Sequence, residues 1–156
     1  MFKDRVMVKL ENNEDMMILA IKIHKAVKAP VKLFNELLKK ERINNYSIIL
    51  TESEFPDYGN FLKKQKRRSD MLVDIDPEKR LYGFICPETE ANGGYYFFKR
   101  LSDELYRKEE YEIKATVLSV ARVEDDIWNS VIEVIDAYIE LKFNDKPQDI
   151  VLKALK

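Results

Sequence analysis

The chain has 156 residues, with 27 Lys and Arg against 28 Asp and Glu, one His and one Cys. This length fits one compact domain, and 46% hydrophobic residues are too many for a disordered chain. The sequence has no apolar run of roughly 18 residues and no signal-peptide order over Met1–Arg5, so we expect a cytoplasmic protein without membrane insertion. The single cysteine, Cys86, excludes an internal disulfide, and the single histidine excludes structural zinc sites built from Cys and His.

The N-terminal part predicts amphipathic helices. Apolar residues spaced three and four apart predict a helix over about 14–28, which ends before Pro30, and a similar stripe predicts a second helix over 31–42. Residues 5–10 also fit an extra edge strand. An apolar stripe needs a surface to cover, so we expect the segment 1–45 to pack on the core of the domain, with a dimer interface as the alternative.

The next elements predict strands around a short helix. Residues 46–51 are β-branched and apolar, which is typical of a buried strand, and a short helix follows over 58–67. Two further strands are expected over 70–76 and 80–86. They form a hairpin, because only the turn at 77–79 separates them.

The rest of the chain continues this alternation. We expect a helix over 90–107 that Thr89 caps, a strand over 111–121 and a helix over 125–143, with 146–156 as a short tail. Alternate residues of this strand fall on opposite faces, with Tyr111, Ile113, Ala115, Val117 and Ser119 on one side and Glu112, Lys114, Thr116, Leu118 and Val120 on the other. The order predicts an α+β fold, a nucleotide-cyclase-like or ferredoxin-like sheet with helices packed on it and N-terminal helices in front.

One motif upstream of the hairpin suggests a family. Residues 67–70 read Arg-Arg-Ser-Asp, an RxxD sequence, and the second strand of the hairpin leads into Pro-Glu-Thr at 87–89. In this order and spacing, residues 46–143 resemble a GGDEF domain, the fold of diguanylate cyclases, in an eroded form. The resemblance implies a degenerate GGDEF-like domain over 46–145.

The departures from the family concern its catalytic residues. The hairpin turn at 78–82 has no glycine where the family has two, and glycine is what allows the backbone to approach a nucleotide closely. Thr51 and Ser53 stand at the end of the first strand, where the family has an Asp-x-Asp-like pair that binds metal ions. The segment 55–67 is also too short for the family's usual helices. We therefore expect no cyclase activity, no catalytic residues, no metal site and no cofactor.

The RxxD motif is the candidate ligand site. In the family this motif binds cyclic di-GMP, and the resemblance implies that Arg67 bonds guanine or phosphate, that Asp70 accepts from guanine N–H groups, and that Lys66 and Arg68 add attraction for phosphate. This predicts a non-catalytic signalling domain that binds cyclic di-GMP. Arg67 and Asp70 should then be exposed, close together and directed to open space. The alternative is a helix-end cation and a strand-start acid in a solvated basic run.

Two other hypotheses place the function in a macromolecular contact. The first is a protein-interaction or assembly module of the same fold without a nucleotide, in which helices 14–42 or 125–143 contact a protein partner, a homodimer included. The second is nucleic-acid binding by the basic run 62–68, with Tyr58 and Phe61 stacking on bases. The net charge of −1 and the lack of a recognised motif disfavour it, so we expect no nucleic-acid partner.

An enzymatic hypothesis groups Glu52, Glu54, Asp74 and Asp76 around a metal ion and requires these acids to converge in space. Asp74 and Asp76 would share one strand face. Ordinary turn chemistry explains the acids near the hairpin better. Gly93-Gly94 superficially matches the GGDEF glycines, but these residues begin a helix and are not expected to form the signature.

Overall fold

The fold was established from a computed structural model, which describes residues 14–123, 126–143 and 150–154. One five-stranded sheet has the strand order β2-β3-β1-β4-β5. The helices are α2 (Glu14–Lys39), α3 (Tyr58–Gln65), α4 (Ala91–Glu109) and α5 (Ile127–Phe143), with a short 3-10 turn, η1 (Pro77–Lys79). The strands are β1 (Tyr46–Ser53), β2 (Met71–Asp76), β3 (Leu81–Pro87), β4 (Ile113–Val120) and β5 (Ile150–Ala154).

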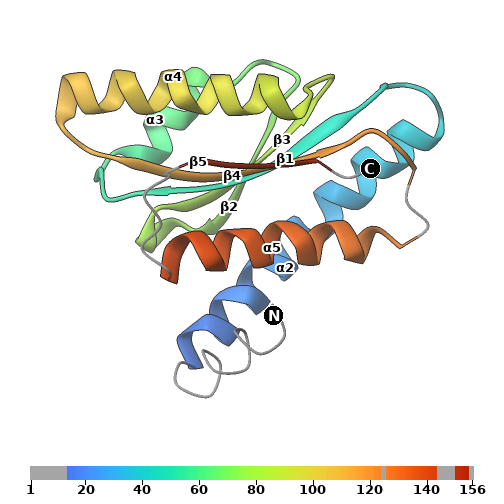
Figure 1. Cartoon of the computed structure of the whole chain (residues 1–156), viewed down its shortest axis with the longest axis horizontal. Helices are drawn as coiled ribbons and strands as arrows, with labels where there is room; N and C mark the ends of the chain where they lie inside the picture. Colours follow the sequence, from blue (N-terminus) through green and yellow to red (C-terminus); the bar gives the residue numbers. More distant parts are fainter. Residues whose placement is uncertain (1–13, 124–125, 144–149, 155–156) are drawn as a thin grey trace.

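The sheet separates two helical layers (Figure 1). Helices α3 and α4 lie on one face, and α2 and α5 lie on the other. Strand β1 is central and runs antiparallel to both β3 and β4, while β2 pairs antiparallel with β3, which confirms the predicted hairpin. The α+β fold expected from the sequence is therefore confirmed.

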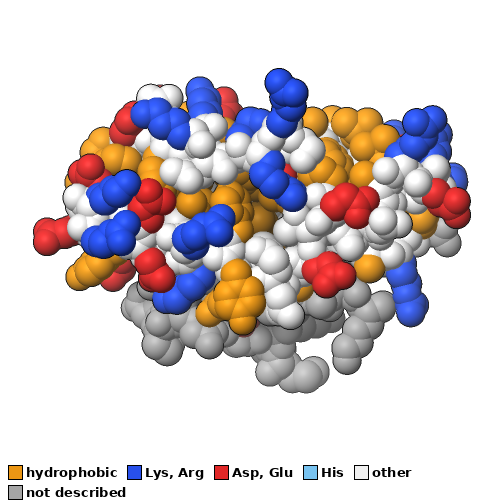
Figure 2. Space-filling view, turned by 90° about the horizontal axis from the view of Figure 1, so that it is seen from above, with side chains coloured by type: hydrophobic (Ala, Val, Ile, Leu, Met, Phe, Trp, Pro, Cys, Tyr) orange, Lys and Arg blue, Asp and Glu red, His pale blue; other side chains and the backbone are white. Residues whose placement is uncertain are grey.

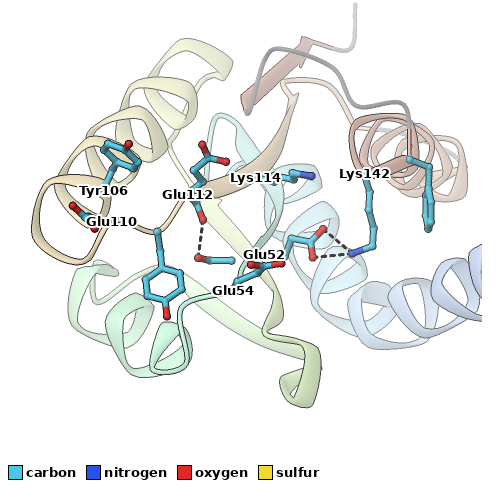
Figure 3. Close-up of a pocket in the computed structure, with 10 residues that line it drawn as sticks. Glu52, Glu54, Tyr106, Glu110, Glu112, Lys114 and Lys142 are labelled. Atoms are coloured by element: carbon cyan, nitrogen blue, oxygen red, sulfur yellow. Dashed lines mark hydrogen bonds and ion pairs between the residues drawn. The ribbon is translucent and has the colours of Figure 1, made fainter.

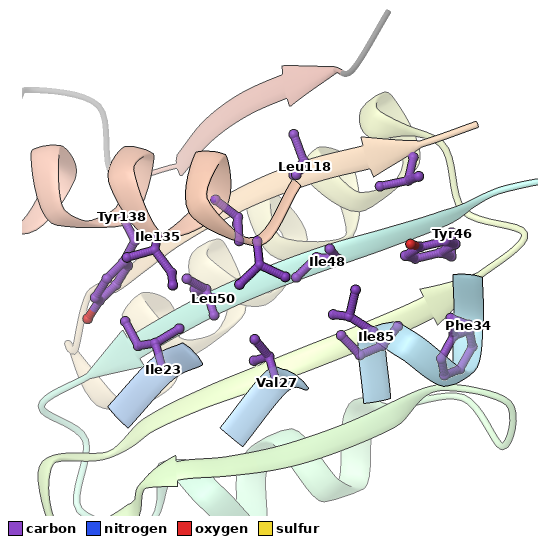
Figure 4. Packing of buried hydrophobic residues seen from close by; sticks show 14 of the residues in the cluster. Ile23, Val27, Phe34, Tyr46, Ile48, Leu50, Ile85, Leu118, Ile135 and Tyr138 are labelled. Carbon is purple, nitrogen blue, oxygen red and sulfur yellow. The ribbon is translucent and has the colours of Figure 1, made fainter. Parts of the chain in front are cut away.

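Alternation along the central strands builds a core on each face of the sheet. In β1, Ile48 and Leu50 belong to the core under α2 and α5, and Ile49 belongs to the core under α3 and α4. Strand β4 does the same with Leu118 on the first side and Val117 on the second, as its alternating sequence predicted. Figure 4 shows the first of these cores, in which side chains of α2 and α5 meet the sheet.

Helix α2 continues through Pro30, whereas the sequence predicted a break there. A proline inside a helix removes one backbone hydrogen bond. The apolar stripe nevertheless runs on without a change of phase, because Val27, Val31 and Phe34 are all buried against the sheet. Tertiary packing thus outweighs the local preference of proline.

The C-terminal segment contains a strand that was not predicted from the sequence. Strand β5 pairs in parallel with β4, with Ala115 opposite Ile150 and Ser119 opposite Ala154. The prediction of a short tail over 146–156 was therefore wrong for these residues. The strand expected over 5–10 lies outside the described residues. None of the helices in the described ranges combines the length and apolar character that a bilayer crossing requires.

Candidate functional site

A cavity of about 470 Å³ opens between the turn that precedes β2 and the first turns of α4. Strand β3 supplies its floor near Cys86, and the α4 side contributes an arginine and an aromatic ring. The residues that line it are Gln65, Arg67, Asp70, Cys86, Glu88, Thr89, Glu90, Gly93, Phe97 and Arg100. The RxxD pair expected from the sequence therefore lies at a cavity.

Arg67 and Asp70 form a tight ion pair within this cavity. The guanidinium Nη2 donates to Asp70 Oδ1 at 2.8 Å, and Nε donates to the same oxygen at 3.0 Å. The backbone amide of Arg67 donates to Asp70 Oδ2 at 2.8 Å. The Asp70 side chain is only 1% exposed, whereas the Arg67 side chain is 52% exposed. The carboxylate is thus an internal acceptor that orients a half-exposed guanidinium.

The expectation that both residues are exposed and directed to open space was wrong for Asp70. Its carboxylate is occupied by Arg67 and buried, so it has no free edge for a guanine N–H group in this arrangement. Lys66 directs its ammonium to the backbone oxygens of Arg67 and Asp70, at 3.2 and 3.0 Å. Neither Lys66 nor Arg68 lines the cavity.

Arg67 also crosses the cavity to the end of β3. Its Nη2 donates to the carbonyl of Pro87 at 2.9 Å and to Oγ1 of Thr89 at 2.6 Å. The hydrogen bonds to Asp70 raise the pKa of Arg67, so its charge is permanent. Thr89 does not cap α4 as predicted, because the helix N-cap is Glu90 and the Thr89 hydroxyl is engaged with Arg67.

The residues that α4 contributes were not predicted from the sequence. Arg100 is exposed on this helix, and its guanidinium carbon lies 5.8 Å from the ring centroid of Phe97. Gly93 leaves the wall of the cavity without a side chain. The only available signal was the helical spacing of 93, 97 and 100, which places them on one side of a helix. Figure 2 shows that basic and acidic side chains are interspersed over the α4 face.

Cys86 lines the same cavity, but its thiol has low reactivity. It is 2% exposed, and burial, followed by the nearby Asp70 carboxylate, raises the pKa of its thiol well above the ordinary value. A neutral buried thiol is a poor nucleophile. Cys86 therefore serves as a small buried residue of the core.

At the end of β1, the hydroxyl groups that replace the expected metal ligands make internal contacts. Thr51 Oγ1 donates to the carbonyl of Lys114 at 2.9 Å and lies 2.5 Å from the Tyr58 hydroxyl. Ser53 Oγ donates to the carbonyl of Glu112 at 2.7 Å. These positions fix β1 to β4 and to α3, and they offer no charged oxygen to a cation.

The acids of the enzymatic hypothesis do not converge. Asp74 pairs with Tyr82 and Asp76 with Leu81, and a bulge between the two acids places them on opposite faces of the sheet. Asp76 bonds Lys22 of α2 at 3.1 Å. Within the described residues no group of three or more His, Cys, Asp or Glu side chains is arranged to bind a metal ion. The prediction that both acids share one strand face was wrong because of the bulge.

Glu52 and Glu54 instead line a second cavity, of about 580 Å³, at the far ends of β1, α4 and α5. Figure 3 shows Glu52 directed to Lys142, with which it forms hydrogen bonds of 2.9 and 2.8 Å. Tyr106, Glu110 and the backbone near Glu112 close the other side. This cavity lies apart from the RxxD pair, since the two share no lining residue.

Comparison with known proteins defines the class of fold. No protein-family model and no curated protein matches the sequence. Among solved structures, the chain is similar to the diguanylate cyclase SiaD of Pseudomonas aeruginosa, in complex with its activator SiaC, with a TM-score of 0.65 and 11% identity over 97% of this chain and 70% of that chain.

A second neighbour is DgcB of Caulobacter crescentus, whose GGDEF domain in complex with c-di-GMP gives a TM-score of 0.63 and 8% identity over 83% of this chain and 89% of that chain. A structure of DgcB that includes its coiled coil gives the same TM-score at 9% identity, over 83% of this chain and 80% of that chain. The chain therefore has a GGDEF-like fold, as the resemblance at the RxxD motif implied.

Proposed function

We propose that this chain is a non-catalytic signalling domain of GGDEF-like fold, which binds cyclic di-GMP in the cavity of Arg67 and Arg100. The observation that carries the proposal is the half-exposed guanidinium of Arg67, which a buried carboxylate orients into a cavity that a second guanidinium also lines. Paired arginines suit a ligand with phosphates and a guanine edge.

The contacts of the residues at the end of β1 support the proposal that the domain lacks cyclase activity. Phosphoryl transfer depends on positioning and on neutralisation of phosphate charge by metal ions. The Thr51 hydroxyl bonds a backbone carbonyl of β4, the Ser53 hydroxyl bonds the carbonyl of the residue before β4, and Glu52 is paired with Lys142. This chemistry favours a stable strand junction over a site for GTP and magnesium.

The ligand proposal rests on the chemistry of the cavity walls. Phe97 supplies an aromatic ring beneath the Arg100 guanidinium, and Gly93 leaves room at the first turn of α4. Asp70 neutralises part of the charge of Arg67, and Glu88 and Glu90 lie at the rim, so the positive potential is local. Such a site recognises an anion through geometry more than through net charge.

The test is calorimetric titration of the purified protein with cyclic di-GMP, with GTP plus magnesium as the comparison nucleotide. We expect micromolar binding of cyclic di-GMP and no conversion of GTP. Arg100→Ala should weaken binding about tenfold or more, as expected for a lost charged hydrogen bond. Arg107→Ala is the matched control, because Arg107 is exposed on the same helix but does not line the cavity. Equal affinity of both variants, or no binding at all, contradicts the proposal.

A protein-interaction module is the second candidate. The observation that favours it is the exposure of large apolar side chains on the opposite layer, with Met17, Ile18 and Ile21 of α2 and Ile132 of α5 each exposed by half or more. The neighbour SiaD was solved with an activator protein, which makes protein control of this fold a reasonable model. A partner that is lost with Ile18→Asp but retained with Arg100→Ala would favour this function.

A further inference from the structure

The turn at Pro87, Glu88 and Thr89, which we name the 87–89 turn, is bonded from two sides. On the cavity side, Arg67 Nη2 donates to the Pro87 carbonyl and to Thr89 Oγ1. The other side faces the connection between α2 and β1. The Glu88 amide donates to the carbonyl of Asn45 at 2.8 Å, and the Asn44 amide donates to Glu88 Oε1 at 2.7 Å.

These bonds maintain a backbone conformation that glutamate does not favour. Glu88 has φ 53°, in the left-handed region that a side chain with a Cβ rarely adopts. Such a conformation persists only where its surroundings enforce it. Ser47 adds one more bond, from its hydroxyl to the Thr89 carbonyl at 2.6 Å. Removing bonds from either side should therefore let the 87–89 turn relax.

Arg67 cannot donate two hydrogen bonds to an anion and also keep all of its hydrogen bonds to Asp70, Pro87 and Thr89. Nη2 carries two hydrogens and already has Asp70, Pro87 and Thr89 oxygens within hydrogen-bond distance. Nε is also engaged with Asp70. A bidentate bond to phosphate or guanine from the outer edge of the guanidinium uses Nη1 and Nη2, so it must draw Nη2 away from the 87–89 turn.

Through its bonds to Asn44 and Asn45, the 87–89 turn is connected to the segment that follows α2. Helix α2 ends at Lys39, and the turn that follows it has Glu41 in the left-handed region and the Arg42 amide bonded to the Leu37 carbonyl, two residues before Asn44. We propose that an anionic ligand on Arg67 releases the 87–89 turn and thereby loosens residues 40–45, so that occupancy of the cavity is transmitted to α2. This inference rests on the proposed function and names the regulation of that site.

The first experiment needs no ligand and measures amide hydrogen exchange over residues 40–45 of the full chain. Glu88→Ala removes the acceptor for Asn44, and exchange there should become about fivefold faster, the size expected for one lost hydrogen bond. Glu90→Ala is the matched control, because it removes the same charge from the rim of the cavity and Glu90 makes no side-chain cap bond. Equal exchange in the two variants overturns the inference.

The second experiment adds cyclic di-GMP as the probe and measures both affinity and exchange. Thr89→Val removes one of the acceptors that compete for Nη2, so it should bind the probe about three- to tenfold more tightly, whereas Thr89→Ser should behave as the unmodified protein. Binding to the unmodified protein should speed exchange at Asn44 and Glu88. Binding without that change overturns the inference and leaves the proposed function standing. If faster exchange in Glu88→Ala is accompanied by no binding of the probe, the link from Glu88 to α2 holds, but both the proposed function and ligand control of that link fail.

Discussion

Nη2 of Arg67 lies 2.8 Å from Oδ1 of Asp70, and the same carboxylate accepts the backbone amide of Arg67. The pair therefore closes the loop between α3 and β2 on itself, and it also orients the guanidinium toward the cavity. One motif thus serves the fold and the proposed site together. A substitution of either partner changes stability as well as binding, which is why Arg100 is the cleaner probe of the ligand.

Asp70→Ala should destabilise the fold substantially. The change removes a buried acceptor of several hydrogen bonds and leaves Arg67 without its partner, but half of the guanidinium remains solvated. We expect a loss of about 2 kcal/mol in the free energy of unfolding, below the cost of breaking a fully buried pair. Urea denaturation measures this, with the neighbouring exposed Arg68→Ala expected to change stability by less than about 0.5 kcal/mol. A similar small effect for both variants would support the solvated basic run instead.

The two adjacent glycines of α4 should respond in opposite ways to alanine. A Cβ on Gly94 would lie 2.8 Å from Val117 Cγ1 in the buried face of β4, whereas a Cβ on Gly93 would have an ordinary contact of 3.6 Å to Thr89. Gly93→Ala should stabilise the helix by up to about 1 kcal/mol, and Gly94→Ala should be destabilising by about 1–2 kcal/mol through overpacking. Thermal unfolding of both variants shows which is more stable. A Gly94→Ala variant more stable than the unmodified protein would show that Val117 of β4 moves aside at little cost.

Stability should fall at alkaline pH. Burial raises the pKa of Cys86, Tyr58 and Tyr138 above their ordinary values of 9.0 for the thiol and 10.0 for the phenols. The unfolded chain releases these protons near the ordinary values and the folded chain retains them, so stability is full below about pH 9 and declines above it, by up to about 1.4 kcal/mol per pH unit for each group. Urea midpoints at pH 8 and 10.5 test this. Tyr138→Phe should reduce the decline, and an unchanged midpoint in the unmodified protein would contradict the prediction.

The Cys86 thiol should resist alkylation in the folded protein. The side chain is nearly inaccessible, and its raised pKa leaves little thiolate at neutral pH. Iodoacetamide at pH 8 should modify the native chain at least about a hundredfold more slowly than the urea-unfolded chain. Rapid labelling of the native protein would show that the cavity opens readily at β3, and mass spectrometry of the intact chain distinguishes the two results.

The local patterns of the sequence predicted most of the fold. Residues 46–51 form a short apolar run with β-branched side chains, and residues 111–121 alternate with a period of two, so the strands observed over 46–53 and 113–120 could be located from the sequence. The hairpin followed from a short turn between apolar runs. The continuity of α2 could not be predicted, because the stripe on both sides of Pro30 is stabilised by contacts with the sheet. Strand β5 was missed because it pairs with β4, which lies far away in the sequence.

The site could be predicted only in part. The RxxD residues are adjacent in sequence, so their proximity was foreseeable. The burial of Asp70 and the convergence of Arg100 on Arg67 depend on how α4 returns over the sheet, which no local pattern encodes. The opposite faces of Asp74 and Asp76 result from a single bulge, and a strict period of two cannot reveal an inserted residue.

The central position of β1 also has a kinetic consequence. Tyr46 pairs with Pro87 on one side and with Val120 on the other, so the middle of the sheet is completed only by segments that lie far along the chain. The chain loses the entropy of closing these long loops before the stabilising strand contacts can form. The sheet therefore gives the fold a high contact order. Refolding after dilution from urea should therefore proceed over milliseconds to seconds, more slowly than a helical bundle of similar size.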